Sequence, residues 1–241
     1  MRIYVINLER RPDRRPGIEQ QLSELNLSPT WVRAVDGHAH DFGAVHQAVL
    51  MQSGLRHTEL ACYLSHLATW QTVIDADDDH AVVLEDDAII GHDFLSVTQS
   101  LVQWLPRIPL IRLSALQKQV GHTIADIDHA HRLVLPTKSV SGTQGYLVSR
   151  HGARRLLTQL NDIRLPIDTA LDRYWLLNTP IGVVTPPLVG EDGDSPSDIA
   201  EAGRRDVSRD HRLIPRIKDS LRKRMGILTM YARIKGQRAT P

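Results

Sequence analysis

Three consecutive carboxylates, Glu85-Asp86-Asp87, stand directly after a short apolar run at residues 81–84. The run is rich in branched residues and too short for a buried helix, so it predicts a buried strand. Because side chains alternate along a strand, Glu85 and Asp87 should point to one side and Asp86 to the other. Like charges repel at this spacing, and a hard divalent cation with oxygen ligands relieves that cost. The stretch indicates either a metal–diphosphate site at the mouth of an α/β sheet, where nucleotides bind, or a solvated acidic turn.

Asp168 is a second candidate for chemistry, because it lies near the start of a predicted helix. The helix dipole favours an anion at that position. A carboxylate fixed on a rigid element can serve as a general base. The alternative is that Asp168 only caps the helix. Asp172 and Asp194 are the other carboxylates that we consider for the role of base.

A basic loop follows the first predicted strand, which spans residues 2–8. The loop contains Arg10 and Arg14 and leads into a predicted helix around residues 16–26. Arginines at the end of a first strand can grip phosphate, because the planar guanidinium matches its oxygens. The alternative is an ordinary solvated helix start.

A helix is predicted to begin at about residue 58, with Thr58 as its N-cap and apolar residues at helical spacing as far as residue 74. Cys62 and His66 lie on a face beside the apolar one. From these residues alone, we interpret His66 as a satisfied interior histidine. We interpret Cys62 as a small buried residue rather than a nucleophile.

The length of 241 residues and a hydrophobic content of 41% are ordinary for one sizeable α/β domain with its own core. Further short apolar runs at residues 110–113, 133–135 and 181–184 predict strands. Two glycines at 142 and 145 either permit close approach of the backbone to a ligand or mark a plain turn. Residues 38–57 and 117–131 are polar and carry no clear pattern. We expect a domain over residues 1–200.

Several functional classes have no support in the sequence. Zinc-ligand spacing, a nucleophile elbow and a phosphate loop are all missing from it. No stretch approaches the roughly 18 consecutive apolar residues of a transmembrane helix. The apolar run at residues 3–6 is shorter than the core of a signal peptide, and Cys62 is the one cysteine. We expect a cytoplasmic protein with no nucleic-acid partner.

The tail, residues 201–241, differs from the rest of the chain in charge. From residue 203 onward it has twelve Lys and Arg against three Asp, a net charge of +9, so the remainder carries −8. Its apolar residues can share one helical stripe, which consists of Ile214, Ile217, Leu221, Met225 and Leu228. A basic amphipathic helix of this kind can lie on an anionic membrane surface. The alternative is a solvated helix packed on the acidic body.

Taken in order, five stretches resemble glycosyltransferase family 25, the lipooligosaccharide-type galactosyltransferases and their relatives. The first two matching stretches run from Tyr4 to Arg14 and from Glu59 to His66. The other three are Val83-Leu84-Glu85-Asp86-Asp87, Gly145-Tyr146-Leu147-Val148-Ser149 with Gly152-Ala153, and Pro166-Ile167-Asp168. The resemblance spans roughly residues 1–200 and leaves out the basic tail.

The resemblance implies a GT-A-like α/β fold with a mixed central sheet and a nucleotide-sugar donor, UDP-galactose. It also implies a saccharide or glycolipid acceptor of the lipopolysaccharide kind. The basic tail, which lies outside the resemblance, predicts a peripheral protein at the inner face of the cytoplasmic membrane. Glu85-Asp86-Asp87 would be the counterpart of the DxD element. Asp87 would bind Mn²⁺ or Mg²⁺, with Glu85 or Asp86 on the metal or the ribose.

The remaining site residues also follow from the resemblance. Near the uridine or diphosphate we expect Asn7, Arg10 and Arg14, and further candidates are His66, Gln144 and Tyr146. Asp168 would be the base of an inverting single displacement. Two other functions stay open: another metal-dependent enzyme acting on nucleotide phosphates, and a membrane-associated saccharide-binding or assembly protein without catalysis.

Overall fold

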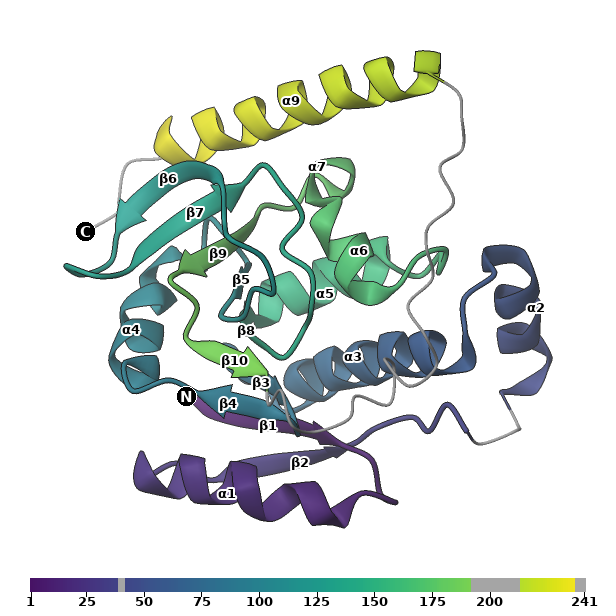
Figure 1. The fold of residues 1–241 in the computed structure, drawn as a ribbon, viewed down its shortest axis with the longest axis vertical. Helices are drawn as coiled ribbons and strands as arrows, with labels where there is room; N and C mark the ends of the chain where they lie inside the picture. Colours follow the sequence, from purple (N-terminus) through teal and green to yellow (C-terminus); the bar gives the residue numbers. More distant parts are fainter. Residues whose placement is uncertain (39–41, 192–212, 237–241) are drawn as a thin grey trace.

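A mixed sheet of eight strands forms the centre of the computed structural model (Figure 1), which describes residues 1–38, 42–191 and 213–236. The strands run in the order β2-β1-β3-β8-β5-β9-β7-β6. Their bounds are β1 Arg2–Asn7, β2 Pro29–Arg33, β3 His80–Glu85, β5 Leu110–Arg112, β6 Gly121–Asp126, β7 Arg132–Pro136, β8 Gly145–Ser149 and β9 Ile181–Thr185. β1 pairs in parallel with β2 and β3, whereas β8 runs antiparallel between β3 and β5. This architecture confirms the predicted α/β class and its mixed sheet.

Helices cover the sheet and supply one wall of the site. Their bounds are η1 Pro12–Arg14, α1 Arg15–Glu24, α2 Gly43–Ser53, α3 His57–Asp75, α4 Phe94–Leu101, η2 Val102–Trp104, α5 Arg150–Gln159, α6 Ile167–Asp172, α7 Tyr174–Leu177 and α9 Leu213–Gly236. The longest helix of the body, α3, packs against α5, α6 and strands β1 and β3. No helix among the described residues is long and apolar enough to cross a membrane.

The central strands are buried on both faces, as their continuous apolar runs predict. In β1, residues 3–7 are all buried, and in β3 residues 81–84 are completely covered. The parallel alignment of these two strands matters for the site, because it brings their carboxyl ends, Asn7 and Glu85, to the same edge of the sheet.

The start of α3 differs from the prediction. The helix begins at His57, with Arg56 in an extended conformation as N-cap, so Thr58 lies inside the first turn. The Glu59 carboxylate accepts a hydrogen bond from the Arg56 backbone N–H at 2.8 Å, which satisfies a donor that the helix leaves open. Gly37 is required here, because a Cβ at that position would lie 2.7 Å from Thr58 Cα.

The acidic triplet also departs from a simple strand. β3 ends at Glu85, and Asp86 and Asp87 form a turn into β4, Ala88–Ile90, which pairs with β10, Val189–Glu191. Alternation along a strand therefore applies to Glu85 only. Asp86 contacts Asn7 and Arg14, whereas Glu85 contacts Thr143 and His66, and all three residues of the triplet line the same cleft.

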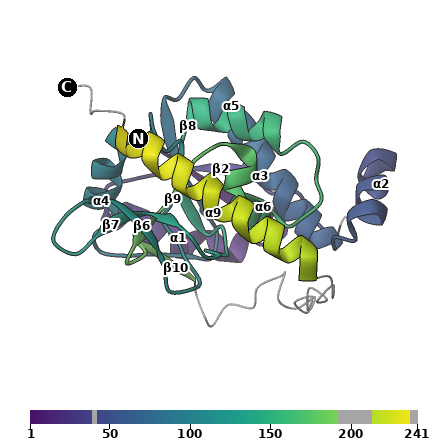
Figure 2. The ribbon, with the colours of Figure 1, turned by 90° about the horizontal axis from the view of Figure 1, so that it is seen from above.

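Two elements, α2 and β6, lie in the ranges without a clear pattern, and β10 was not predicted. α9 packs on β6 and α7, and Figure 2 shows it crossing over the β6 end of the molecule. Ile227, Met230 and Ile234 of α9 are almost completely buried and belong to the main hydrophobic core. The described part of the tail is thus packed on the body. Among the predicted stripe, the side chains of Ile214 and Ile217 lie outside the described residues.

Candidate active site

An open cleft lies at the carboxyl ends of the parallel strands β1 and β3. α3 forms one wall, and the loops after β1 and β2 form the other. Its lining consists of Ile6, Leu8, Arg10, Arg14, Ala34, Val35, Gly37, His38, Thr58, Ala61, Cys62, Ser65, His66, Glu85, Asp86 and Asp87. Five of the residues expected at the site therefore meet in one cleft with the metal candidate Asp87.

Asp86 is held by two donors from the first strand and the helix after it. Its Oδ1 accepts a hydrogen bond from Arg14 Nη1 at 3.0 Å, and its Oδ2 accepts one from Asn7 Nδ2 at 2.7 Å. The Asp86 and Arg14 side chains are only 8% and 10% exposed. Both oxygens are thus engaged by N–H donors. Asp86 ties β1 and η1 to the end of β3.

Asn7 is itself fully engaged and almost completely buried. Besides Asp86, its Nδ2 donates to the Arg11 carbonyl at 2.9 Å, and its Oδ1 accepts from Arg15 Nε at 2.7 Å. Arg15 in turn stacks over the Trp31 ring, 4.9 Å from its centroid. Asn7 lies behind the cleft lining and positions Asp86.

Glu85 faces α3 and the turn before β8. Thr143 Oγ1 donates to Glu85 Oε1 at 2.5 Å, and His66 Nε2 lies 3.4 Å from the same oxygen. Burial would raise the pKa of the Glu85 carboxyl, but the hydrogen bond and charge of His66, the Thr143 hydrogen bond and the Arg112 charge outweigh it and lower the pKa. Glu85 is therefore ionised at neutral pH, and 23% of its side chain stays exposed to the cleft.

His66 is held from its other nitrogen by Tyr146, whose hydroxyl lies 2.9 Å from Nδ1. The two ring nitrogens of His66 thus each face a polar partner, Tyr146 at Nδ1 and Glu85 at Nε2. His66 and Tyr146 are each 1% exposed. His66 is buried, as predicted from the sequence alone. It also contacts Glu85 of the triplet, as expected of the site candidate that the resemblance implies.

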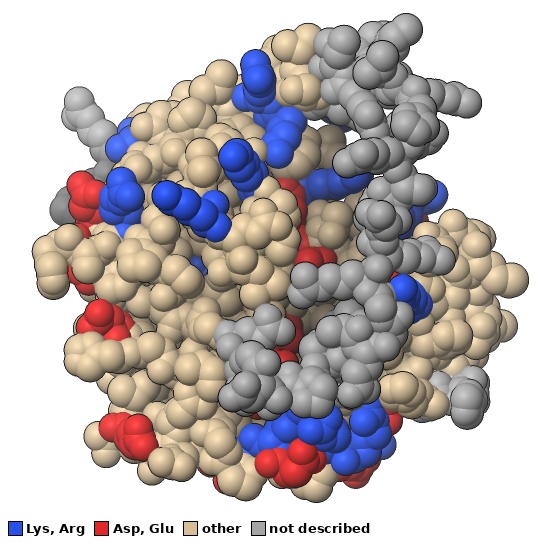
Figure 3. Space-filling model, in the orientation of Figure 1, with Lys and Arg blue, Asp and Glu red and all other residues tan. Residues whose placement is uncertain are grey.

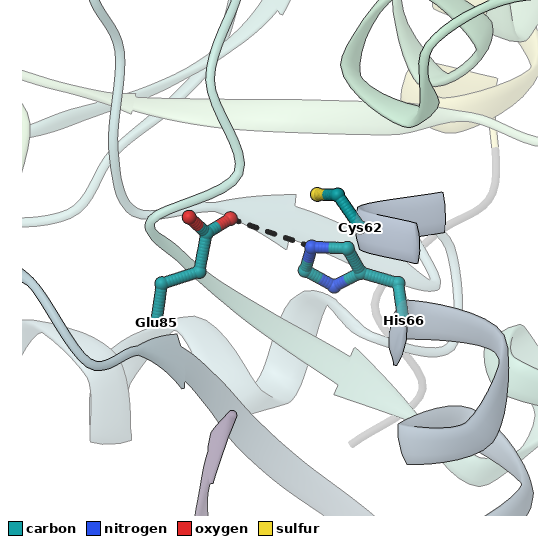
Figure 4. Close-up of side chains that lie close together, drawn as sticks. All are labelled: Cys62, His66 and Glu85. Carbon is teal, nitrogen blue, oxygen red and sulfur yellow. Dashed lines mark ion pairs between the residues drawn. The ribbon is translucent and has the colours of Figure 1, made fainter. Parts of the chain in front are cut away.

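Cys62 completes a group of three side chains with His66 and Glu85, whose possible ligand atoms lie within 4.8 Å of one another (Figure 4). Cys62 and His66 come from successive turns of α3 and face Glu85 at the end of β3. Burial, followed by the charges of Glu85, Asp168 and Asp87, raises the pKa of the Cys62 thiol well above its ordinary value. Since the thiolate is the nucleophile and the metal ligand, Cys62 is poorly suited to either role.

The triplet fits a hard divalent cation through part of its carboxylates. Mn²⁺ and Mg²⁺ take oxygen ligands. Both oxygens of Asp86 and Oε1 of Glu85 already accept hydrogen bonds or contact His66. Residues that would hold a cation here are Asp87, which lines the cleft, and Glu85 through Oε2. The donor set fits the predicted metal, with Asp86 as a brace.

Asp168 and Asp172 lie on α6 and differ in their contacts. Asp172 is ion-paired with Arg112 at 2.8 Å and accepts hydrogen bonds from the Val140 backbone and the Ser139 hydroxyl. Asp168 accepts bonds from the backbone of Thr169 at 2.6 Å and of Gly142 at 3.3 Å. Asp172 therefore fixes a loop, whereas Asp168 has a lighter set of contacts. Asp194 lies outside the described residues.

The position of Asp168 relative to the triplet follows from its electrostatic effects. Its charge, together with those of Glu85 and Asp87, contributes to the raised pKa of Cys62. Its charge also acts on the Arg112 guanidinium. Burial lowers the pKa of that group, although the charges of Asp172, Asp168 and Glu85 act to raise it. Asp168 thus lies near the triplet, although it is not part of the cleft lining.

The remaining predicted residues divide between the cleft and its support. Arg10 lines the cleft and pairs with Asp36 at 3.0 Å. The Gln144 carbonyl accepts from the Glu85 backbone N–H at 3.0 Å, and its side-chain Oε1 is buried with no hydrogen-bond partner among the described residues. Gln144 and Tyr146 lie outside the lining. The Gln144 backbone supports Glu85 and the Tyr146 hydroxyl supports His66, and both supported residues face the cleft.

Three residues that sequence reasoning did not single out are important in this geometry: Arg112, Thr143 and Ser65. Arg112 is 1% exposed and holds Asp172, and Ser65 Oγ accepts from the Val35 backbone at 2.8 Å, which fixes the loop after β2. The sequence does indicate a role for Arg112, because a single charged residue inside an apolar strand is buried only when it has a partner of opposite charge. It gives no such indication for Thr143 and Ser65, because their roles depend on tertiary contacts.

Comparison with known proteins agrees with the resemblance. The family model described as glycosyltransferase family 25 (LPS biosynthesis protein) matches residues 1–171. The chain is 30% identical to procollagen galactosyltransferase 2 of Homo sapiens over 173 residues, which are 64% of this chain and 27% of that protein. It is also 30% identical to procollagen galactosyltransferase 1 of Danio rerio over 169 residues, 64% of this chain and 28% of the relative.

A third relative has a different description. The probable inactive glycosyltransferase 25 family member 3 of Bos taurus is 30% identical over 183 residues, 70% of this chain and 31% of that protein. The matches thus span less than a third of the length of these relatives. Because the family model covers more than two thirds of the sequence, including β1, α3 and the acidic triplet, the chain belongs to glycosyltransferase family 25.

Proposed function

We propose that the protein is a metal-dependent glycosyltransferase that transfers a sugar, galactose from UDP-galactose, to a saccharide acceptor. The acceptor in this proposal is a lipooligosaccharide, a lipopolysaccharide or a similar surface glycan. The observation that carries the proposal is the acidic triplet in an open cleft at the carboxyl ends of β1 and β3, in a chain of glycosyltransferase family 25. The choice of galactose is supported by the names of two relatives.

The cleft supplies the groups that a nucleotide-sugar donor needs. Arg10 and Arg14 give it positive charge beside the triplet, and the planar guanidinium of arginine suits phosphate oxygens. Ile6, Leu8 and Val35 give it apolar surface on which a base can lie. Asp87 and Glu85 would hold Mn²⁺ or Mg²⁺. When bound, the cation would neutralise negative charge on the departing diphosphate.

We propose Asp168 as the general base of a single displacement. The acceptor hydroxyl oxygen forms a bond to the anomeric carbon while the bond from that carbon to the diphosphate oxygen breaks. The hydroxyl proton passes to the Asp168 carboxylate, and the bonding electron pair leaves with UDP. The reaction inverts the anomeric centre. Support for Asp168 over Asp172 comes from the ion pair of Asp172 with the buried Arg112.

Ligand-dependent thermal stability tests the donor site. A ligand that binds only the native state raises the melting temperature by mass action. We expect UDP to raise it in the presence of Mn²⁺, and we expect Asp87→Asn to remove that shift. Asp93→Asn, at an exposed acid outside the cleft, is the matched control and should keep it. If UDP and other nucleotides give no shift at saturating concentration, the donor-site proposal is wrong.

Product analysis tests the reaction. Release of intact UDP identifies a glycosyltransferase, whereas cleavage within the diphosphate would identify another nucleotide-phosphate enzyme. Proton NMR of the new glycoside should show an inverted anomeric configuration. Asp168→Asn should retain the UDP-dependent thermal shift and lose at least about 10²-fold in turnover, the lower limit for a general base. Retained configuration, or near wild-type turnover by this variant, would rule out Asp168 as the base.

The relative named as probably inactive makes a second function concrete: a saccharide-binding protein without catalysis. Such a protein would bind saccharide equally well after Asp87→Asn and would show no turnover with any nucleotide sugar. The same two assays therefore separate it from the enzyme. The acidic triplet and the hydrogen bonds to Glu85 and Asp86 favour the enzyme.

A further inference from the structure

The orientation of α9 on the body is fixed by one buried face. Ile227, Met230 and Ile234 are at most 3% exposed and pack into the core beside β6 and α7. Lys235 Nζ donates to the Ile124 carbonyl at 2.9 Å, and Lys223 Nζ lies 4.8 Å from the centroid of the Trp175 ring. The face of α9 that turns away from the body is therefore determined by the fold.

The outward face of α9 is apolar along its centre. Leu221, Met225 and Leu228 have exposed fractions of 54%, 68% and 53%. At 3.6 residues per turn, these three side chains share one side of the helix, opposite to the buried face. Ten large hydrophobic residues are exposed among the described residues, and these three of them lie within two turns of one helix. We call this set the outer stripe.

Cations border the outer stripe on both sides. With about 100° of rotation per residue, Arg222 and Arg233 lie on one flank and Arg224 and Lys235 on the other. The side chains of Arg233 and Lys235 donate to Asn178 Oδ1 and the Ile124 carbonyl of the body, so Arg222 and Arg224 are the cations directed at a partner. All four residues are exposed, and residues 220–236 contain no Asp or Glu. Figure 3 shows Lys and Arg side chains gathered along the upper part of the molecule, where Figure 1 places α9. The combination is an apolar line between two cationic margins.

We propose that this face of α9 docks on the surface of an anionic lipid bilayer. The outer stripe enters the boundary between headgroups and acyl chains, and the exposed guanidinium groups of Arg222 and Arg224 bind lipid phosphates. Residues 220–236 contain no carboxylate that could pair with a cationic group of a partner. Their charge pattern therefore favours an anionic lipid surface over a cationic or mixed-charge partner. The proposal does not depend on the proposed transfer reaction, because docking requires no turnover.

The buried face of α9 determines how the proposal is tested. Removal of the tail would uncover the core residues of β6 and α7, so a truncated protein would report on folding as well as on docking. Substitutions on the exposed outer stripe avoid this problem. Met225→Ser/Leu228→Ser removes its centre, and Val45→Ser/Met51→Ser, at two exposed apolar residues of α2, is the matched control.

The experiment is co-sedimentation of the full chain with vesicles of phosphatidylcholine alone or with phosphatidylglycerol added. We expect binding to the anionic vesicles only. The α9 double variant should weaken that binding by about tenfold or more, since two large apolar side chains leave the interface. The α2 control should bind as the wild type does. Arg222→Gln/Arg224→Gln should also weaken binding, and added salt should reduce the difference from wild type.

Other outcomes would overturn the proposal. No binding to anionic vesicles, or binding that survives the α9 double variant, means that this face does not dock on lipid. Concentration-dependent dimers that disappear in the same variant, without vesicle binding, would assign the outer stripe to a second copy of the chain instead. Circular dichroism and urea unfolding confirm that each variant is folded, so a loss of binding cannot arise from loss of structure.

Discussion

Replacing Asp86 with asparagine should destabilise the fold and leave the metal site intact. The carboxylate accepts from Arg14 at 3.0 Å and from Asn7 at 2.7 Å, in a position that is only 8% exposed. An amide of the same shape can accept from one of these donors but turns an N–H toward the other, and it removes the negative charge beside Arg14. The perturbation therefore breaks a charge-assisted pair with little change in volume.

The size of the effect follows from these contacts. Hydrogen bonds to charged groups contribute about 1.5–3 kcal/mol each. Because both bonds share one carboxylate, their contributions do not add fully. We expect Asp86→Asn to lower the free energy of unfolding by about 2–3 kcal/mol. For a chain of this size, that corresponds to a fall in melting temperature of roughly 4–12 °C.

The assay compares Asp86→Asn with Asp87→Asn, an equally conservative change at the next residue. Melting temperatures are measured without ligand and with Mn²⁺ plus UDP. Asp86→Asn should melt at a lower temperature and still respond to the ligands, whereas Asp87→Asn should lose the response. If Asp86→Asn keeps its ligand-free melting temperature and loses the Mn²⁺-dependent shift, Asp86 is a metal ligand and the assignment of a bracing role is wrong.

Three further predictions concern other parts of the molecule. Glu85→Gln should lower the free energy of unfolding by about 1–3 kcal/mol at neutral pH. Because the folded-state pKa of Glu85 lies below its ordinary 4.5, this difference should shrink as the pH falls below that value, and a constant difference in urea titrations would contradict the assigned ion pair. Cys62 should react with iodoacetamide more slowly than free cysteine at pH 7.5, since its pKa is raised, and mass spectrometry showing faster labelling would contradict a neutral thiol. Met230→Ser should destabilise the whole protein by about 2–5 kcal/mol in urea unfolding, and an unchanged midpoint would show that α9 is not part of the cooperative core.

The parts of the fold that the sequence predicted are those in which local pattern and burial agree. The run before Glu85 is apolar throughout and forms the fully covered strand β3, and the apolar run at residues 181–184 forms the buried strand β9. β6 was not predicted, because it lies at the edge of the sheet and most of its side chains are only half-buried or exposed. Its apolar signal is weak, since α9 rather than the sheet interior covers it.

The candidate site was predictable as a region and not as a set of contacts. The sequence placed Asn7, Arg14 and Asp86 near one another through a family resemblance, but only the tertiary structure shows that they bind each other. Tyr146 likewise reaches the site through His66. Spacing along a chain indicates which side chains share an edge of the sheet. Which of them contact a ligand depends on packing between distant elements.

The tail shows the same limit in a different form. Leu221, Met225 and Leu228 do share a helical side, as their spacing predicts, yet the body is contacted by Ile227, Met230 and Ile234. The helix has two apolar faces, and periodicity identifies a face without indicating its neighbour. The described residues of the stripe predicted to bind a membrane, Leu221, Met225 and Leu228, are exposed, and the contact with the body uses the other face.

The bonding of Asn7 has a consequence for the variation that this position can accept. Its side chain donates twice, to Asp86 and the Arg11 carbonyl, and accepts once, from Arg15. Aspartate cannot donate, and glutamine is longer by a methylene in a buried place. A selection for folded protein from a library randomised at this one codon should therefore return asparagine. Escape from asparagine should require a simultaneous change at Asp86 or Arg15, so the three positions are expected to change as a group.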